Sequence, residues 1–118
     1  MRILVVEDDA AVVGVIAEAI RARGDGALVA LDGQEALDLL ETTAVDGVFL
    51  DLVMPGLNGL AVLARIRSRR PELPVVILSG HADEDRTREA LALGALDVIK
   101  KPAVVIHLSD TLARLKRS

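Results

Sequence analysis

The stretch Ile3-Leu-Val-Val-Glu-Asp-Asp9 joins a short run of branched aliphatic residues directly to three carboxylates. A run that is apolar at every position, rather than at every second one, is typical of a parallel strand buried on both faces. Comparable runs recur along the chain and alternate with longer stretches, which indicates several such strands. The runs are Ile3–Val6, Ala27–Ala30, Val48–Leu50, Val75–Leu78 and Asp97–Lys100.

The longer stretches carry apolar residues at the three- and four-residue spacing of amphipathic helices. Gly24 can end the first stretch, Asp32 can begin the second, and Asn58 can cap the third. We therefore predict five strand–helix units that form one parallel sheet with helices on both faces. The apolar positions that carry this spacing in the last four helices are Ala36, Leu37, Leu39, Leu40, Leu60, Leu63, Ile66, Leu91, Leu93, Ile106, Leu108, Leu112 and Leu115.

The composition narrows the class of protein. The chain of 118 residues fits a single domain, 1–118, and 52% hydrophobic residues with Phe49 as the only aromatic predict an aliphatic core. The net charge of −4 and the lack of Tyr and Trp disfavour direct nucleic-acid binding. The chain has no cysteine, and its apolar runs are too short for a signal peptide or a membrane span. We therefore expect a cytoplasmic protein without membrane contact.

Polar residues that could carry chemistry follow nearly every aliphatic run. Glu7 and Asp8 follow the first run, Asp51 the third, Ser79 the fourth and Lys101 the fifth. Because ligands of open parallel sheets bind beyond the carboxyl ends of the strands, we expect these side chains to converge. Clustered carboxylates favour a hard divalent cation such as Mg²⁺, and a carboxylate can act as a nucleophile that forms an aspartyl phosphate. The hydroxyl and the ammonium group could then donate to phosphoryl oxygens.

Five motifs make the chain resemble response-regulator receiver domains of the chemotaxis-regulator type, over essentially its whole length. The motifs occur in the family's order and spacing, at Ile3–Asp9, Asp32–Leu37, Asp51–Gly59, Pro74–Gly80 and Lys101-Pro102. The resemblance implies an α/β, flavodoxin-like (βα)5 three-layer sandwich, with a parallel sheet in the strand order 2-1-3-4-5. It also implies a role in two-component signalling.

The resemblance assigns roles to individual residues. It implies that Asp51 is the phosphoacceptor, that Ser79 and Lys101 contact the phosphoryl oxygens, and that the bond from Lys101 to Pro102 is cis. The implied cofactor is Mg²⁺, for which Mn²⁺ could substitute. Its implied protein ligands are Glu7, Asp8, Asp51 and, through the backbone carbonyl, Val53.

The implied partner is a histidine kinase or a histidine phosphotransfer protein, which donates the phosphoryl group. The modified domain would then shift between two conformations and present a different surface. The family usually docks or dimerises through the face of the fourth helix, fifth strand and fifth helix, so a homodimer through that face is one expectation. The domain would assist its own phosphorylation but would not be an enzyme acting on a separate substrate.

Several positions depart from the family's pattern. Val98 stands where an aromatic residue is usual, and Ala103 replaces the usual Phe after Lys-Pro. Output could therefore run through backbone shifts near the fourth helix, or the output face could be unusual or weakened. Val53 and His81 flank the expected path of the hydrolytic water. Since an apolar Val53 cannot orient that water, we expect a long-lived phosphorylated form.

Other interpretations of the same residues remain open at this point. Glu7-Asp8-Asp9 could simply cap the first helix, where acidic residues suit the helix dipole. A phosphorylation-independent, degenerate receiver would act only as a protein-interaction module. An aspartyl phosphohydrolase would typically carry a second acid at the position of Val53, and a flavodoxin would need a phosphate loop after the first strand.

Overall fold

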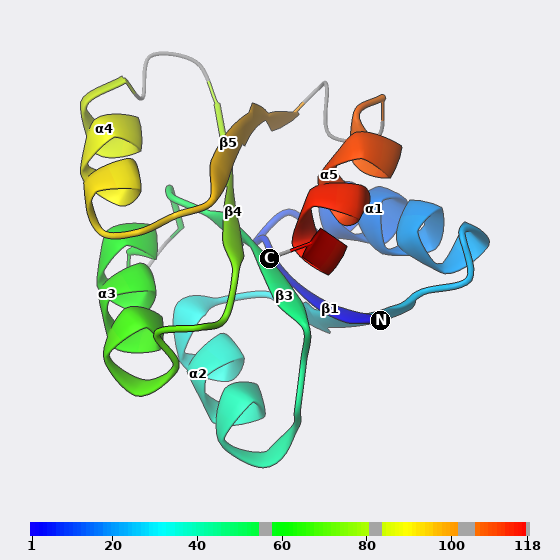
Figure 1. Cartoon of the computed structure of the whole chain (residues 1–118), viewed down its shortest axis with the longest axis horizontal. Coiled ribbons are helices and arrows are strands. Elements are labelled where there is room, and N and C mark those ends of the chain that lie inside the picture. The colour runs from blue at the N-terminus through cyan, green and yellow to red at the C-terminus, as the bar shows by residue number, and fades with distance from the viewer. Residues whose placement is uncertain (55–57, 81–83, 102–105, 118) are drawn as a thin grey trace.

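The computed structural model describes residues 1–54, 58–80, 84–101 and 106–117, and it contains a five-stranded parallel sheet (Figure 1). The strand order β2-β1-β3-β4-β5 is the order that the resemblance implied. The strands are β1 Arg2–Val6, β2 Gly26–Ala30, β3 Gly47–Asp51, β4 Val75–Ser79 and β5 Asp97–Lys100. The helices are α1 Ala10–Ala22, α2 Gly33–Thr42, α3 Gly59–Arg69, α4 Glu84–Ala92 and α5 Leu108–Arg117.

Helices cover both faces of the sheet, which gives the molecule three layers (Figure 1). Residues of α1 and α5 form one apolar core with Phe49, and residues of α2, α3 and α4 form a second core with Leu50. Neighbouring residues of a strand point to opposite faces, so β3 must be apolar at every position to fill both cores. This arrangement confirms the flavodoxin-like α/β fold.

Local sequence signals located the element ends closely. Asp32 accepts a hydrogen bond from the N–H of Glu35 (2.8 Å), and Asn58 accepts one from the N–H of Ala61 (2.9 Å). Gly24 follows α1 with a φ of 87°, a left-handed conformation that favours glycine. The strands begin and end within one residue of the predicted runs, with Asp51 and Ser79 as the last residues of β3 and β4.

Three apolar residues that the helical spacing included are exposed. Leu93 follows the end of α4 and Ile106 precedes α5, so neither lies in the helix to which it was assigned. Leu91 belongs to α4 but points outward, and within the described part of that helix only Ala90 is buried. The periodicity was therefore wrong at these positions. Leu91 and Leu93 are exposed because α4 is short and mostly polar and makes only a small contact, and Ile106 lies before α5 begins.

Some of the predictions fall outside the described residues. These are the position of His81, the Lys101–Pro102 peptide bond and the position of Ala103. Within the part of the chain that the structure describes, no helix has both the length and the apolar character that crossing a bilayer requires.

Candidate functional site

Three carboxyl groups meet at the carboxyl ends of β1 and β3. Ligand oxygens of Glu7, Asp8 and Asp51 all lie within 4.8 Å of one another. Strand pairing explains this proximity, because Val6 is the register partner of Leu50 and each of these two residues is followed directly by an acid. Glu7 and Asp51 are each only 1% exposed, whereas Asp8 is exposed. The fold therefore holds two of the acids out of water and leaves the third open to solvent.

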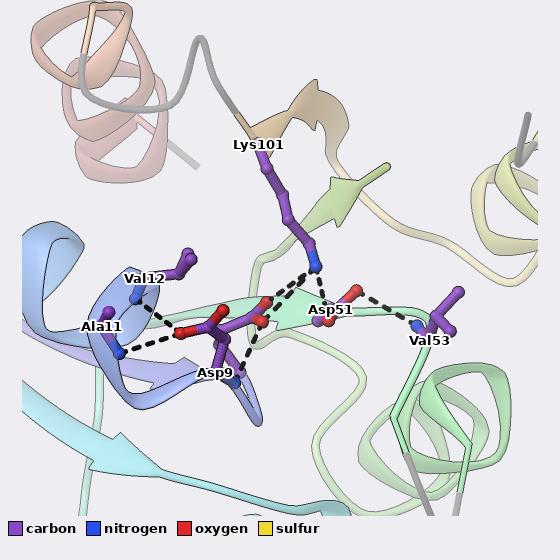
Figure 2. Close-up of polar contacts among 7 residues, drawn as sticks. Asp9, Ala11, Val12, Asp51, Val53 and Lys101 are labelled. Atoms are coloured by element: carbon purple, nitrogen blue, oxygen red, sulfur yellow. Dashed lines mark hydrogen bonds and ion pairs between the residues drawn. The ribbon is translucent and has the colours of Figure 1, made fainter. Parts of the chain in front are cut away.

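Lys101, the residue after β5, contacts both buried acids, and Figure 2 shows its ammonium group beside Asp51. Its Nζ lies 2.9 Å from Asp51 Oδ2 and 3.2 Å from Glu7 Oε2. Burial alone would lower the pKa of Lys101, but its hydrogen bonds and the negative charges of Asp51 and Glu7 outweigh burial and raise that pKa. The ammonium group is therefore held charged beside the carboxylates.

The backbone after β3 contacts the other oxygen of Asp51. The N–H of Val53 donates to Asp51 Oδ1 at 3.1 Å (Figure 2), so both carboxylate oxygens have a partner. The side chain of Val53 is 47% exposed. This contact depends on the path of the chain after the strand, and the sequence carried no signal for it. The predicted role of the Val53 carbonyl as a metal ligand stays a prediction.

Glu7 is a buried carboxyl group with a raised pKa. Burial raises the pKa of Glu7 from 4.5 to about 7, and the hydrogen bond and charge of Asp51 add to this effect, while the N–H of Asp9 and the ammonium group of Lys101 oppose it. Glu7 Oε1 accepts hydrogen bonds from the N–H of Asp9 (3.2 Å) and from Lys101 Nζ (3.4 Å), whereas the buried Oε2 forms an ion pair with Lys101 but accepts no hydrogen bond. Near neutral pH, the folded protein therefore holds a proton on a share of Glu7 side chains.

The donor set fits a divalent cation. It consists only of carboxylate oxygens, which Mg²⁺ prefers, and one ammonium group does not neutralise three acids. The buried Glu7 Oε2, which contacts Lys101 only as an ion pair, could accept a hydrogen bond from a metal-bound water. Glu7, Asp8 and Asp51 are the described residues that could hold the ion.

Asp9 has a different role from its two neighbours. Its Oδ1 accepts hydrogen bonds from the N–H groups of Ala11 (2.9 Å) and Val12 (3.2 Å) and so caps α1 (Figure 2). The capping interpretation of the acidic triplet is thus correct for Asp9 alone, and the site interpretation is compatible with Glu7 and Asp8.

Ser79 ends β4 beside this cluster. Its neighbour Leu78 is the register partner of Asp51, and the serine is only 4% exposed. The hydroxyl therefore lies at the same edge of the sheet as the acids. Its predicted contact with a phosphoryl group stays a prediction.

Sequence reasoning missed Gly59. The N–H of Gly59 donates to the carbonyl of Leu52 at 3.1 Å, and a Cβ added to the glycine would lie 2.4 Å from the carbonyl oxygen of Asp51. The start of α3 thus packs directly against the backbone of Asp51. The only available signal was the place of this glycine at the end of the Asp51–Gly59 motif.

Glu7→Gln should flatten the pH dependence of stability in the metal-free protein. Folding raises the pKa of Glu7 from 4.5 to about 7, so the folded state binds the proton of Glu7 more tightly than the unfolded state does. The stability that this protonation adds is therefore fully present below about pH 4.5 and is lost as the pH rises through 7. A neutral glutamine has no such loss. We expect the variant to gain on the order of 1 to 3 kcal/mol relative to the parent between about pH 5 and pH 8. Urea unfolding with a chelator present measures this.

The exposed Glu18 on α1 provides the matched control, since the stability of Glu18→Gln should vary with pH as that of the parent does. Added Mg²⁺ should reverse the order at pH 8, because the ion stabilises the carboxylate of the parent and not the amide. Equal pH slopes for the parent and Glu7→Gln would contradict the assignment of a raised pKa to this residue.

Comparisons of this chain with known proteins agree on one family. A family model described as the response regulator receiver domain matches residues 3–113. The DNA-binding transcriptional regulator NtrC of Klebsiella pneumoniae is 38% identical over 98 residues, which cover 83% of this chain and 21% of NtrC. The response regulator MprA of Mycolicibacterium vanbaalenii is 37% identical over 116 residues, or 98% of this chain and 49% of MprA. The chain therefore spans half or less of these relatives.

Solved structures agree with this picture. The receiver domain of NtrX from Brucella abortus superposes with a TM-score of 0.93 at 35% sequence identity, with 98% of each chain covered. The Francisella response regulator 1452 receiver domain gives a TM-score of 0.89 at 31% identity, with 98% of this chain and 96% of that chain covered.

Proposed function

We propose, from the premise that this chain belongs to the response regulator receiver domain family, that its Asp51 accepts a phosphoryl group from a histidine kinase or a histidine phosphotransfer protein. The observation that supports this most strongly is the pairing of a buried Asp51 carboxylate with the ammonium group of Lys101, inside a cluster of acids. Residues 1–118 would then form one receiver domain in a cytoplasmic two-component pathway.

The proposed chemistry is a single displacement at phosphorus. A carboxylate oxygen of Asp51 forms the new O–P bond, the P–N bond of the donor's phosphohistidine breaks, and its electron pair leaves with the imidazole. Lys101 and Ser79 would stabilise the phosphoryl oxygens as their charge develops. The N–H of Val53 holds Asp51 Oδ1 and so orients the carboxylate.

A divalent ion would complete the site. Glu7, Asp8 and Asp51, with the carbonyl of Val53, would hold Mg²⁺, and Mn²⁺ could take its place. When bound, the ion would offset the charge of the acids and of the incoming phosphoryl group.

The proposed output is a change of surface rather than turnover of a separate substrate. The face formed by α4, β5 and α5 would dock a target or a second copy of the domain, and no part of this output requires nucleic-acid contact by the domain itself. Val98 contributes only a small side chain to this face.

Incubation with Mg²⁺ and acetyl phosphate tests the proposal. The parent protein should gain the mass of one phosphoryl group, and Asp51→Asn should gain none, because the amide oxygen is not a competent nucleophile. Intact-protein mass spectrometry gives the readout. Asp38→Asn, at an exposed acid of α2, should be labelled like the parent. A parent without label would favour the degenerate receiver, and label on Asp51→Asn would mean that another residue is the acceptor.

The lifetime of the phosphorylated form tests the role of Val53. The exposed, apolar Val53 side chain cannot hydrogen-bond a water molecule near Asp51. Val53→Asn should therefore speed the loss of the phosphoryl group, by roughly tenfold, because an amide can orient the attacking water. Val53→Leu, which stays apolar, should keep the parental rate. The decay of label after removal of acetyl phosphate measures this, and equal rates in all three proteins would refute the hypothesis.

A further inference from the structure

A pocket between α2 and α3 lies away from the acid cluster. The two helices lie side by side over the same core on one face of the sheet (Figure 1). The pocket has a volume of about 220 Å³ and an apolar floor of Leu37, Leu40 and Ile66. It lies along the second halves of both helices, whereas Gly59, at the other end of α3, packs against the backbone of Asp51. We call it the α2–α3 pocket.

The charged side chains around the α2–α3 pocket are mostly positive. They are three arginines, Arg65, Arg69 and Arg70, and one acid, Glu41. This excess of positive charge contrasts with the net charge of −4 of the whole chain. The helix dipole favours cations in the last turn of α3, which includes Arg69, but Arg65 lies before that turn. The dipole alone therefore does not account for the cluster.

The three arginines differ in how they are held. Arg70 is half-buried, and its Nη2 donates to the carbonyl of Leu40 at 2.9 Å, which fixes the guanidinium group beside the pocket. Arg69 Nη1 lies 2.8 Å from Glu41 Oε1, but both side chains are more than half exposed, so solvent screens this pair. Arg65 is exposed and has no hydrogen-bond or ion-pair partner among the described residues. Because a guanidinium group carries several N–H donors, all three arginines keep donors for a further acceptor.

An apolar floor beneath guanidinium groups suits an anion that also carries apolar atoms. The planar guanidinium fork binds carboxylate and phosphate oxygens through two parallel hydrogen bonds. The floor stabilises only a ligand that brings apolar surface next to its charged group, since burial of that surface is what favours binding there. The volume of the pocket limits such a ligand to a small molecule.

We propose that the α2–α3 pocket binds a small organic anion. Its carboxylate or phosphate group contacts Arg65 and Arg70, and its apolar part lies on the floor of the pocket. The bound anion would connect α2 to α3 and raise the free energy of unfolding, because it binds the folded chain and not the unfolded one. This site is separate from the proposed phosphorylation of Asp51 and does not depend on it.

Titration of the isotope-labelled protein with benzoate and with phenyl phosphate, followed by NMR, tests the proposal. A chelator is present, so that no metal ion can carry either anion to the acid cluster. We expect saturable binding of at least one of the two anions, with the largest amide shifts in residues 37–41 and 65–70. Acetate, which lacks the ring, and benzyl alcohol, which lacks the charge, should bind at least about fivefold more weakly than the better anion. The ratio of the affinities for benzoate and phenyl phosphate identifies the preferred charged group.

Substitutions around the pocket should shift the affinity in opposite directions. Arg65→Gln should weaken binding by about fivefold, because it removes a charged donor. Glu41→Gln should strengthen binding by about threefold, because it removes the acid that lines the pocket. Arg117→Gln makes the same change of charge at an exposed position of α5 and should keep the parental affinity. Both pocket residues are exposed, and urea unfolding checks that each variant folds like the parent.

Several results would overturn the proposal. One is the absence of saturable binding of both anions at millimolar concentration, and another is a set of largest amide shifts outside α2 and α3. Equal affinities of the parent, Arg65→Gln and Glu41→Gln would also overturn it, and so would equal losses in Arg65→Gln and Arg117→Gln. Asp51→Asn should bind the better anion like the parent, so a failure of this site and a failure of phosphorylation are distinguishable.

Discussion

Lys101→Met should lower the free energy of unfolding of the metal-free protein at about pH 8 by roughly 2 kcal/mol. The variant leaves the buried acids Glu7 and Asp51 without their shared cation, and removal of one partner of a buried ion pair is strongly destabilising. The partial exposure of Lys101 reduces the effect below that of a fully buried pair. The loss should shrink toward pH 5, where Glu7 is protonated in the folded state. Urea unfolding with a chelator present measures both values.

Mg²⁺ should stabilise Lys101→Met more than it stabilises the parent, because the ion replaces the missing positive charge. Phosphorylation by acetyl phosphate should still fall, by roughly a hundredfold, since the proposed charged donor to the phosphoryl oxygens is lost. The neighbouring Lys100 is exposed, and Lys100→Met should change stability by less than about 0.5 kcal/mol. Parental stability and a parental rate in Lys101→Met would show that Lys101 takes no part in the site.

Gly59→Ala should destabilise the protein by about 3 kcal/mol and impair the site at the same time. The added Cβ would lie 2.4 Å from the carbonyl oxygen of Asp51 and 2.4 Å from Leu52 Cα, and neither backbone atom can rotate away. Either α3 or the end of β3 must shift, which is the kind of overpacking that costs up to a few kcal/mol. Because Asp51 ends β3, Mg²⁺ affinity should fall in the fraction of protein that stays folded.

Gly14→Ala is the matched control for this substitution. Gly14 lies in α1, and nothing lies within 4 Å of a Cβ added there. Alanine should stabilise that helix by roughly 0.5 to 1 kcal/mol. Thermal unfolding and Mg²⁺ titration of both variants test the pair. Equal free energies of unfolding for the two variants would mean that α3 and β3 can move apart at Gly59 without loss of stability.

The two substitutions address different parts of one arrangement. Lys101 supplies positive charge from the position directly after β5, and Gly59 supplies close packing from the start of α3. Asp51 lies between them. Its carboxylate oxygen Oδ2 accepts a hydrogen bond from the ammonium group of Lys101, and its backbone carbonyl lies against Gly59. The position of this acid therefore depends on segments that are far apart in the sequence.

The secondary structure could be predicted from the sequence because its signals are local. A strand buried on both faces must be apolar at every position, as in Val75–Leu78, and such a run has few competing interpretations. Asp32 and Asn58 indicate where their helices begin, because a short polar side chain can accept a hydrogen bond from the N–H group three residues ahead. Leu91 shows the limit of periodicity, since its exposure depends on what lies opposite the helix.

The sequence by itself determined which residues end the strands, and the resemblance added the order of those strands. The resemblance already limited the metal ligands of the acidic triplet to Glu7 and Asp8, and the structure gives Asp9 a separate role as the cap of α1, while Glu7 lies beside Asp51. Only the tertiary structure decided the raised pKa of Glu7 and the close packing of Gly59 against the backbone of Asp51. Both depend on distances between atoms of separate strands and helices, and such distances arise only when the chain packs.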